Sequence, residues 1–183
     1  PHFRPWIFAL EGTTDLASEQ IRFLRSKTSV FLSQMPVETR SLYYGHFEKQ
    51  NRYRRDPKDS PLKPKISFSE KVITLARKIK GVHTRPEDFA SSVLEFFEKE
   101  GFRYTLQPGD QTGMDLEGFL LRIKKGYCEH YASSAALLFW AAGHPARVVV
   151  GYQGGQFNRV GGFWKVQQKD AHAWMEYLNS KDE

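Results

Sequence analysis

The sequence predicts an α+β fold in which a buried helix packs on an antiparallel sheet. Two observations carry this prediction. Residues 127–142 form a helical segment whose second half consists of Ala, Leu, Phe and Trp, and a helix that is apolar on every side is usually buried. Three segments with strand character follow, at residues 146–152, 163–168 and 171–178, separated by glycine-rich turns. One helix followed by such a meander is an α+β arrangement.

Two amphipathic helices are predicted ahead of the buried one. Residues 69–79 repeat apolar side chains at helical spacing, with Ser69 as N-cap and Gly81 just past the end. Residues 86–100 do the same, with Pro86 in the first turn and Gly101 after the end. We further expect a strand over residues 102–106, a loop over 108–113 and a short helical segment over 115–123.

The rest of the chain divides into two further parts. Residues 1–55 are predicted to be a β-rich N-terminal segment, with strands over 3–10, 21–25, 29–32 and 38–47 and turns at Glu11-Gly12 and at Asp15. Residues 56–66 contain three prolines among charges and are predicted to be a linker. Residues 67–183 then form the core.

Composition bounds the class of protein. The chain has 183 residues, of which 40% are apolar and 26% charged, as in soluble globular proteins. Its longest apolar run, residues 135–143, is too short to cross a bilayer. Because the sequence does not begin with Met, we expect it to be a piece of a longer protein.

The net charge of +6 is concentrated in one basic cluster. An anionic polymer or membrane surface is one interpretation, but Asp56 and Asp59 interrupt the cluster and no nucleic-acid-binding motif accompanies it. We therefore favour a solvated basic edge and expect no nucleic-acid partner. The cluster comprises Lys49, Arg52, Arg54, Arg55, Lys58, Lys63 and Lys65.

Cys128 is the only cysteine, which excludes an internal disulfide framework and a zinc site built on several thiolates. A lone cysteine is more often a small buried hydrophobic residue than a catalyst. Cys128, however, is predicted at the N-terminus of the buried helix, where unpaired N–H groups and the helix dipole stabilise a thiolate. Its own N–H could help to hold a developing oxyanion, and Gly126 lets backbone or substrate approach closely.

A thiolate nucleophile needs a base, and His172 is the best candidate among six histidines. It is predicted on a strand face shared with Asp170, Trp174 and Glu176, with small Ala neighbours beside it. His130 lies only two residues from Cys128 and points to a different face of the helix. A metal site made of Cys128, His130 and His172 would lack a fourth ligand, so no metal or cofactor is expected.

Three motifs in order, GYCEHYASSAALLFWAAG, PARVVVGYQGG and KDAHAWMEY, resemble those of the bacterial transglutaminase-like proteins. These are papain-like thiol enzymes with a Cys–His–Asp triad, and the resemblance covers about residues 115–177. It implies Cys128 as the nucleophile and His172 as the base and later acid. In the family the Asp lies on the next strand, in a segment like GW-x-x-x-D-P. Neither Asp170 nor Asp182 fits that pattern, so we expect the triad acid beyond Glu183.

The resemblance implies a cysteine-dependent acyl transfer from a glutamine carboxamide, through a thioester, to an amine. The same machinery could hydrolyse the thioester, as a protease or amidase does, or the fold could serve as an inactive binding module. The most similar subgroup places this domain in the periplasm, anchored to the bacterial inner membrane by segments outside this chain. Its partners would then be protein or peptide substrates of the cell envelope that carry glutamine and an amine acceptor.

Overall fold

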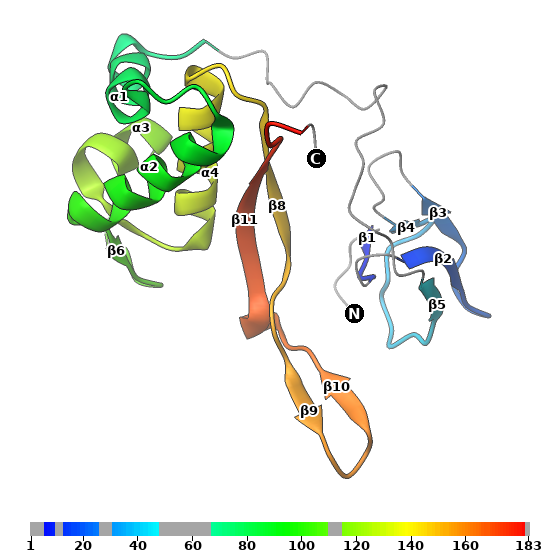
Figure 1. Cartoon of the computed structure of the whole chain (residues 1–183). Coiled ribbons are helices and arrows are strands. Elements are labelled where there is room, and N and C mark those ends of the chain that lie inside the picture. The colour runs from blue at the N-terminus through cyan, green and yellow to red at the C-terminus, as the bar shows by residue number, and fades with distance from the viewer. Residues whose placement is uncertain (1–5, 10–12, 26–30, 48–66, 110–114, 182–183) are drawn as a thin grey trace. The chain divides into compact units, whose positions relative to one another are not determined.

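The computed structural model describes residues 6–9, 13–25, 31–47, 67–109 and 115–181 (Figure 1). The chain divides into two compact units, Pro1–Asp59 and Ser60–Glu183. The predicted linker at residues 56–66 lies outside the described residues, as does the basic cluster from Lys49 to Lys65. None of the helices in the described ranges is long and apolar enough to cross a membrane.

The described residues of the first unit form five short strands: β1 (Trp6–Ile7), β2 (Thr13–Ala17), β3 (Phe23–Arg25), β4 (Phe31–Ser33) and β5 (Tyr44–Phe47). They form an antiparallel sheet in the order β1-β4-β3 and an antiparallel β2-β5 pair. The buried side chains of Ile7, Leu16 and Phe31 make a small core.

Two predictions for this unit are wrong. Asp15 lies inside β2 rather than in a turn, and its carboxylate accepts the N–H of Leu16 at 2.8 Å. The strand predicted from residue 38 begins only at Tyr44. Asp favours turns through local hydrogen bonds, but here the pairing of β2 with β5 outweighs that preference.

Helices α1 (Glu70–Lys80) and α2 (Pro86–Lys99) confirm the two amphipathic segments. The Ser69 hydroxyl accepts the N–H of Val72, and Gly81 ends α1 with φ of 52°. Pro86 occupies the first turn of α2, where its missing N–H costs no helical hydrogen bond.

The segment before Cys128 is helical, as predicted for residues 115–123. Helix α3 (Leu116–Gly118) is continued by a π-helical turn, η1 (Phe119–Ile123), and Lys124 then adopts a left-handed conformation with φ of 51°. The predicted strand over 102–106 is reduced to β6 (Arg103–Tyr104), which pairs in parallel with β7 (Lys125–Gly126).

Helix α4 (Cys128–Ala141) is the buried helix that the sequence predicts. Its side chains are enclosed by α1, α2, η1 and the strands, and Phe139 and Leu138 have no exposed surface. Burying one such side chain contributes about 1.5–3 kcal/mol, so this helix anchors the unit. Gly143, with φ of 89°, turns the chain away after α4.

The strands after α4 do not form the predicted three-stranded meander. β8 (Ala146–Tyr152) pairs antiparallel with β11 (Ala171–Tyr177) over their whole length. Between them, β9 (Gln156–Asn158) and β10 (Phe163–Lys165) form a separate two-stranded hairpin, which extends from the β8–β11 pair in Figure 1. The α+β class is confirmed.

Candidate active site

Cys128 is the first residue of α4, as the sequence predicts. Its N-cap, Tyr127, has extended backbone angles (φ −119°, ψ −174°), so the helix starts abruptly at the cysteine. The thiol is half-buried and forms no disulfide. Within the described part of the chain, the N–H groups of Cys128 and Glu129 have no acceptor, as expected for the first helical turn.

The backbone that leads into α4 is held by its neighbour β6. The N–H of Arg103 donates to the carbonyl of Lys124, and the N–H of Thr105 donates to the carbonyl of Gly126, both at 2.8 Å. The Lys124 ammonium also donates to Glu100 at the end of α2. These contacts fix the position at which the chain turns into the helix.

His172 is the second residue of β11 and pairs with Gly151 of β8. The predicted strand is confirmed from Ala171 to Tyr177, with Ala173 buried toward the core and Ala171 exposed. On the face of His172, the Trp174 indole covers Gly151, where a Cβ atom would lie 3.0 Å from the ring.

The structure brings Cys128 and His172 to the same end of the α4–β11 pair. The rings of Phe139 and Tyr177 touch, with centroids 5.0 Å apart. Cys128 lies 11 residues before Phe139 (139 − 128), or about 16 Å along the helix. His172 lies five residues before Tyr177 (177 − 172), or about 16 Å along the strand. The elements α4 and β11 pack together and run in the same direction (Figure 1), so both residues lie toward the N-terminal ends of their elements.

No hydrogen bond joins the Cys128 sulfur to His172 among the described residues, and α4 packs on the alternate face of β11, on Met175 and Tyr177. Catalytic hydrogen bonds that are long in the free enzyme often tighten only when substrate binds.

The acidic residues near His172 are engaged elsewhere. Asp170 was predicted on the strand face of His172, but it ends a short 3-10 helix (Gln168–Asp170), and its carboxylate accepts the N–H of Gln167 at 2.7 Å. Glu176 accepts hydrogen bonds from Trp174 at 3.0 Å and from Arg147 at 2.8 Å. Asp182 lies outside the described residues.

His130 is a residue of the site that sequence reasoning set aside. Its ring lies against Gly126 and Tyr127, the two residues that precede the cysteine. The sequence signal for this role is the third helical position of His130, because a side chain at that position often accepts a hydrogen bond from the N–H of the N-cap residue. The metal alternative finds no support in the geometry, since the described residues contain no group of three His, Cys, Asp or Glu able to hold an ion.

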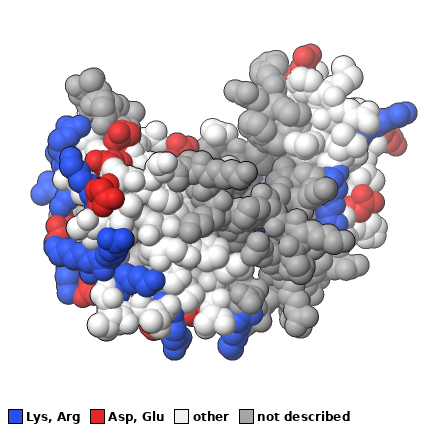
Figure 2. Space-filling view, turned by 90° about the horizontal axis from the view of Figure 1, so that it is seen from above, with Lys and Arg blue, Asp and Glu red and all other residues white. Residues whose placement is uncertain are grey.

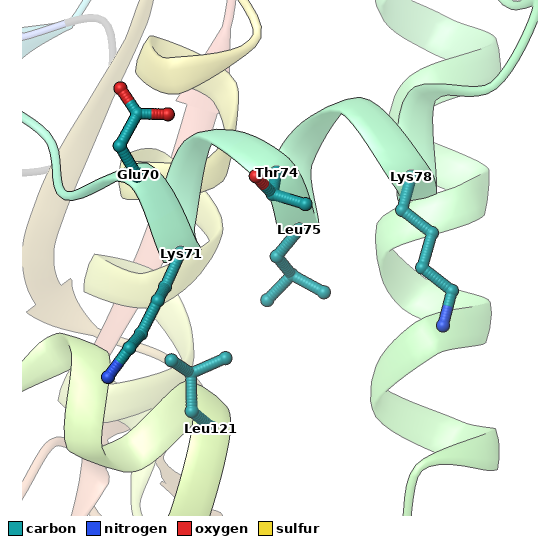
Figure 3. A pocket seen from close by; sticks show the side chains of 6 residues that line it. All are labelled: Glu70, Lys71, Thr74, Leu75, Lys78 and Leu121. Carbon is teal, nitrogen blue, oxygen red and sulfur yellow. The ribbon is translucent and has the colours of Figure 1, made fainter.

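Charged side chains and one hollow mark the surface of the described residues. Figure 2 shows Lys and Arg side chains interspersed with Asp and Glu on the face in view. A shallow hollow lies between α1 and η1, and its lining includes neither Cys128 nor His172 (Figure 3). It is lined by Glu70, Lys71, Thr74, Leu75, Lys78 and Leu121.

Comparison with known proteins decides the family. Residues 73–183 match the transglutaminase-like superfamily. The chain belongs to this superfamily. A protein-glutamine gamma-glutamyltransferase of Pseudomonas aeruginosa is 34% identical over 97% of this chain. The chain spans 27% of the length of that relative.

Solved structures agree with the fold. The crystal structure of the periplasmic domain of TgpA from Pseudomonas aeruginosa, bound to ethylmercury, has a TM-score of 0.78 at 31% identity. It covers 100% of this chain, which in turn covers 66% of that structure. A putative cysteine protease from Cytophaga hutchinsonii has a TM-score of 0.50 at 17% identity over 94% of this chain, which supports the fold alone.

Proposed function

We propose that the chain carries the nucleophile and the base for cysteine-dependent acyl transfer from the carboxamide of protein-bound glutamine to an amine. The observation that supports the proposal is the place of Cys128, which is the first residue of a buried helix that packs against the strand carrying His172. The glutamyltransferase of Pseudomonas aeruginosa, similar over 97% of this chain, supports the choice of acyl donor.

The proposed reaction has two halves. His172 takes the thiol proton, and the Cys128 sulfur attacks the carboxamide carbon to give a tetrahedral oxyanion. The imidazolium then returns the proton to the leaving nitrogen, the C–N bond breaks, and ammonia leaves a thioester behind. An amine attacks the thioester with His172 as base, the C–S bond breaks, and the new amide and the free thiol are formed.

The free N–H groups at the start of α4 give the oxyanion a place to bind. The N–H of Cys128 is the donor that the sequence suggested, and that of Glu129 is likewise without an acceptor among the described residues. Each donor aimed at a developing oxyanion contributes on the order of 3 kcal/mol in hydrolases. We infer that this first turn forms the oxyanion site.

We also propose a periplasmic setting, with glutamine- and amine-bearing proteins or peptides of the cell envelope as substrates and an anchor in segments outside this chain. Support comes from the similarity to the periplasmic domain of TgpA. The glutamyltransferase relative is much longer than this chain, which leaves room for such segments.

The test measures incorporation of a fluorescent amine into a glutamine-bearing protein, together with ammonia release. Cys128→Ala should lose at least about 1000-fold, and His172→Gln about 100-fold or more, since both act in the bond-breaking steps. His83→Gln is the matched control, because His83 is exposed in the turn between α1 and α2.

Two outcomes would change the proposal. If the wild-type chain releases ammonia but incorporates no amine, the thioester is resolved by water and the chain is an amidase. If neither Cys128→Ala nor His172→Gln alters a measured activity, the assigned pair is not the catalytic pair.

A further inference from the structure

The ring of His130 is wedged against the backbone that leads into the nucleophile. A Cβ atom on Gly126 would lie 2.8 Å from Cγ and 2.9 Å from Nδ1 of His130. The Tyr127 ring meets the imidazole edge-on, with centroids 4.4 Å apart, and the buried Phe119 ring lies 5.5 Å away. The imidazole therefore has little room to move on three sides.

His130 also supplies a hydrogen bond that the N-cap lacks. The N-cap of a helix is usually Ser, Thr, Asp or Asn, but the N-cap of α4 is Tyr127. The N–H of Tyr127 donates to Nδ1 of His130 at 3.3 Å. In an ordinary capping box, Glu or Gln at this third helical position accepts the same N–H. Because Nδ1 accepts, a neutral His130 ring carries its proton on Nε2.

A neutral acceptor at the position of His130 affects the charge near Cys128 differently from a carboxylate. A carboxylate at the same position would satisfy Tyr127 equally well, but it would place a negative charge within one turn of Cys128. That charge would oppose both a thiolate and an oxyanion at the helix N-terminus. A neutral imidazole completes the cap without adding a second carboxylate to the first turn, where the exposed Glu129 already follows the cysteine.

The hydrogen bond completes a clamp around the two residues before Cys128. On one side, the carbonyl of Gly126 accepts the N–H of Thr105 from the chain beyond β6. On the other side, His130 holds the N–H of Tyr127 and covers Gly126. The directions of the Cys128 sulfur and of its N–H follow from this clamp.

We propose that His130 is a positioning residue for Cys128, a neutral hydrogen-bond acceptor that fixes the first turn of α4. Its effect on turnover rests on the proposed acyl transfer, whereas its effect on the thiol does not. The substrate meets Cys128 and His172, while His130 acts only through the backbone of Gly126 and Tyr127.

Three variants of the whole chain separate the roles of His130. His130→Gln keeps a neutral acceptor, His130→Glu keeps an acceptor with a charge, and His130→Met has similar length without a good acceptor. The measurements are the rate of Cys128 alkylation by iodoacetamide, the kcat and KM of amine incorporation, and the midpoint of urea unfolding as a control for folding.

We expect His130→Gln to stay close to wild type in alkylation and turnover. His130→Met should lower kcat about 10- to 100-fold with little change in KM, because the nucleophile is misplaced rather than the substrate site lost. His130→Glu should fold as well as His130→Gln but alkylate about 2- to 5-fold more slowly.

The proposal is overturned if His130→Met and His130→Gln behave alike, because the ring then contributes packing only. It is also overturned if His130→Glu alkylates as fast as His130→Gln. A measurement on the wild-type chain needs no variant: long-range ¹H–¹⁵N correlation of labelled histidine should show Nε2–H and an unprotonated Nδ1, and the opposite tautomer would refute the hydrogen bond. If wild type transfers no acyl group, the alkylation and tautomer results still decide the role of His130.

Discussion

Gly126→Ala tests whether the backbone before the nucleophile is as tightly enclosed as the structure indicates. The added methyl would lie 2.8 Å from Cγ, 2.9 Å from Nδ1 and 3.0 Å from Cβ of His130. Non-bonded carbon atoms ordinarily stay about 3.5–4.0 Å apart, so the contact is too close by more than half an ångström. The ring cannot retreat freely, because Phe119 packs beside it and is fully buried.

The free-energy change can be estimated from three contributions. Overpacking of this kind costs about 1–3 kcal/mol. Displacing the imidazole breaks its hydrogen bond with Tyr127, which costs about 1 kcal/mol more. Replacing Gly by Ala restricts the unfolded chain and returns about 0.4–1 kcal/mol. We therefore expect Gly126→Ala to lower the free energy of unfolding by about 1–3.5 kcal/mol.

The assay is urea unfolding followed by far-ultraviolet ellipticity, with the alkylation rate of Cys128 measured on the folded variant. The matched control is a double-mutant cycle with His130→Ala, which removes Cγ and Nδ1 but leaves Cβ. In that background Gly126→Ala should cost clearly less, with a coupling of at least about 1 kcal/mol. If Gly126→Ala lowers the free energy of unfolding equally in wild type and in His130→Ala, the reasoning is refuted, because the added methyl then does not contact the His130 ring.

Three further predictions concern the same unit. The hydroxyl of Ser134 is fully buried and has no hydrogen-bond partner among the described residues. Ser134→Ala should therefore raise the free energy of unfolding in urea by about 0.5–1 kcal/mol. A loss of stability would show that the hydroxyl does form a hydrogen bond. Hydrogen bonds from Ser180 lower the pKa of Glu87 from its ordinary 4.5 to about 2, so this carboxylate stabilises the fold fully above pH 4.5, and the stability is lost as the pH falls toward 2. Glu87→Gln should therefore flatten the dependence of the urea midpoint on pH in that range. An unchanged slope would count against the contact with Ser180. Burial, with Lys80 nearby, lowers the pKa of His144 below its ordinary 6.5, so the unfolded chain binds a proton more readily and the fold loses stability as the pH falls below 6.5. His144→Phe should remove this loss of stability, as measured by thermal unfolding across that pH range. An equal loss in the variant would contradict the assignment to His144.

Local pattern was enough to predict the helices and the place of the thiol. Ser69, Gly81 and Pro86 mark helix boundaries through interactions within one turn of the chain, and the structure has the helices where these residues put them. Cys128 at the start of α4 follows from the apolar run behind it. The alternation of residues 171–177 likewise put His172 and Trp174 on one face.

Local pattern could not predict the contacts between segments that are distant in the sequence. β8 pairs with β11 across a separate hairpin, and β6 pairs with β7 across α3 and η1. Short strands carry little pattern of their own, and their partners are set by long-range pairing rather than by neighbours in sequence. Asp15 shows the same effect, because the pairing of β2 overrides a turn preference.

Local patterns predict one thiol at a helix N-terminus, an imidazole on a strand, and motifs of a known superfamily. How these groups are held depends on packing between distant segments. The Phe139 ring packs on Tyr177 and joins α4 to β11, and the His130 ring lies against Gly126 and Tyr127. Both depend on distances and directions in space, which residue spacing along one element does not specify.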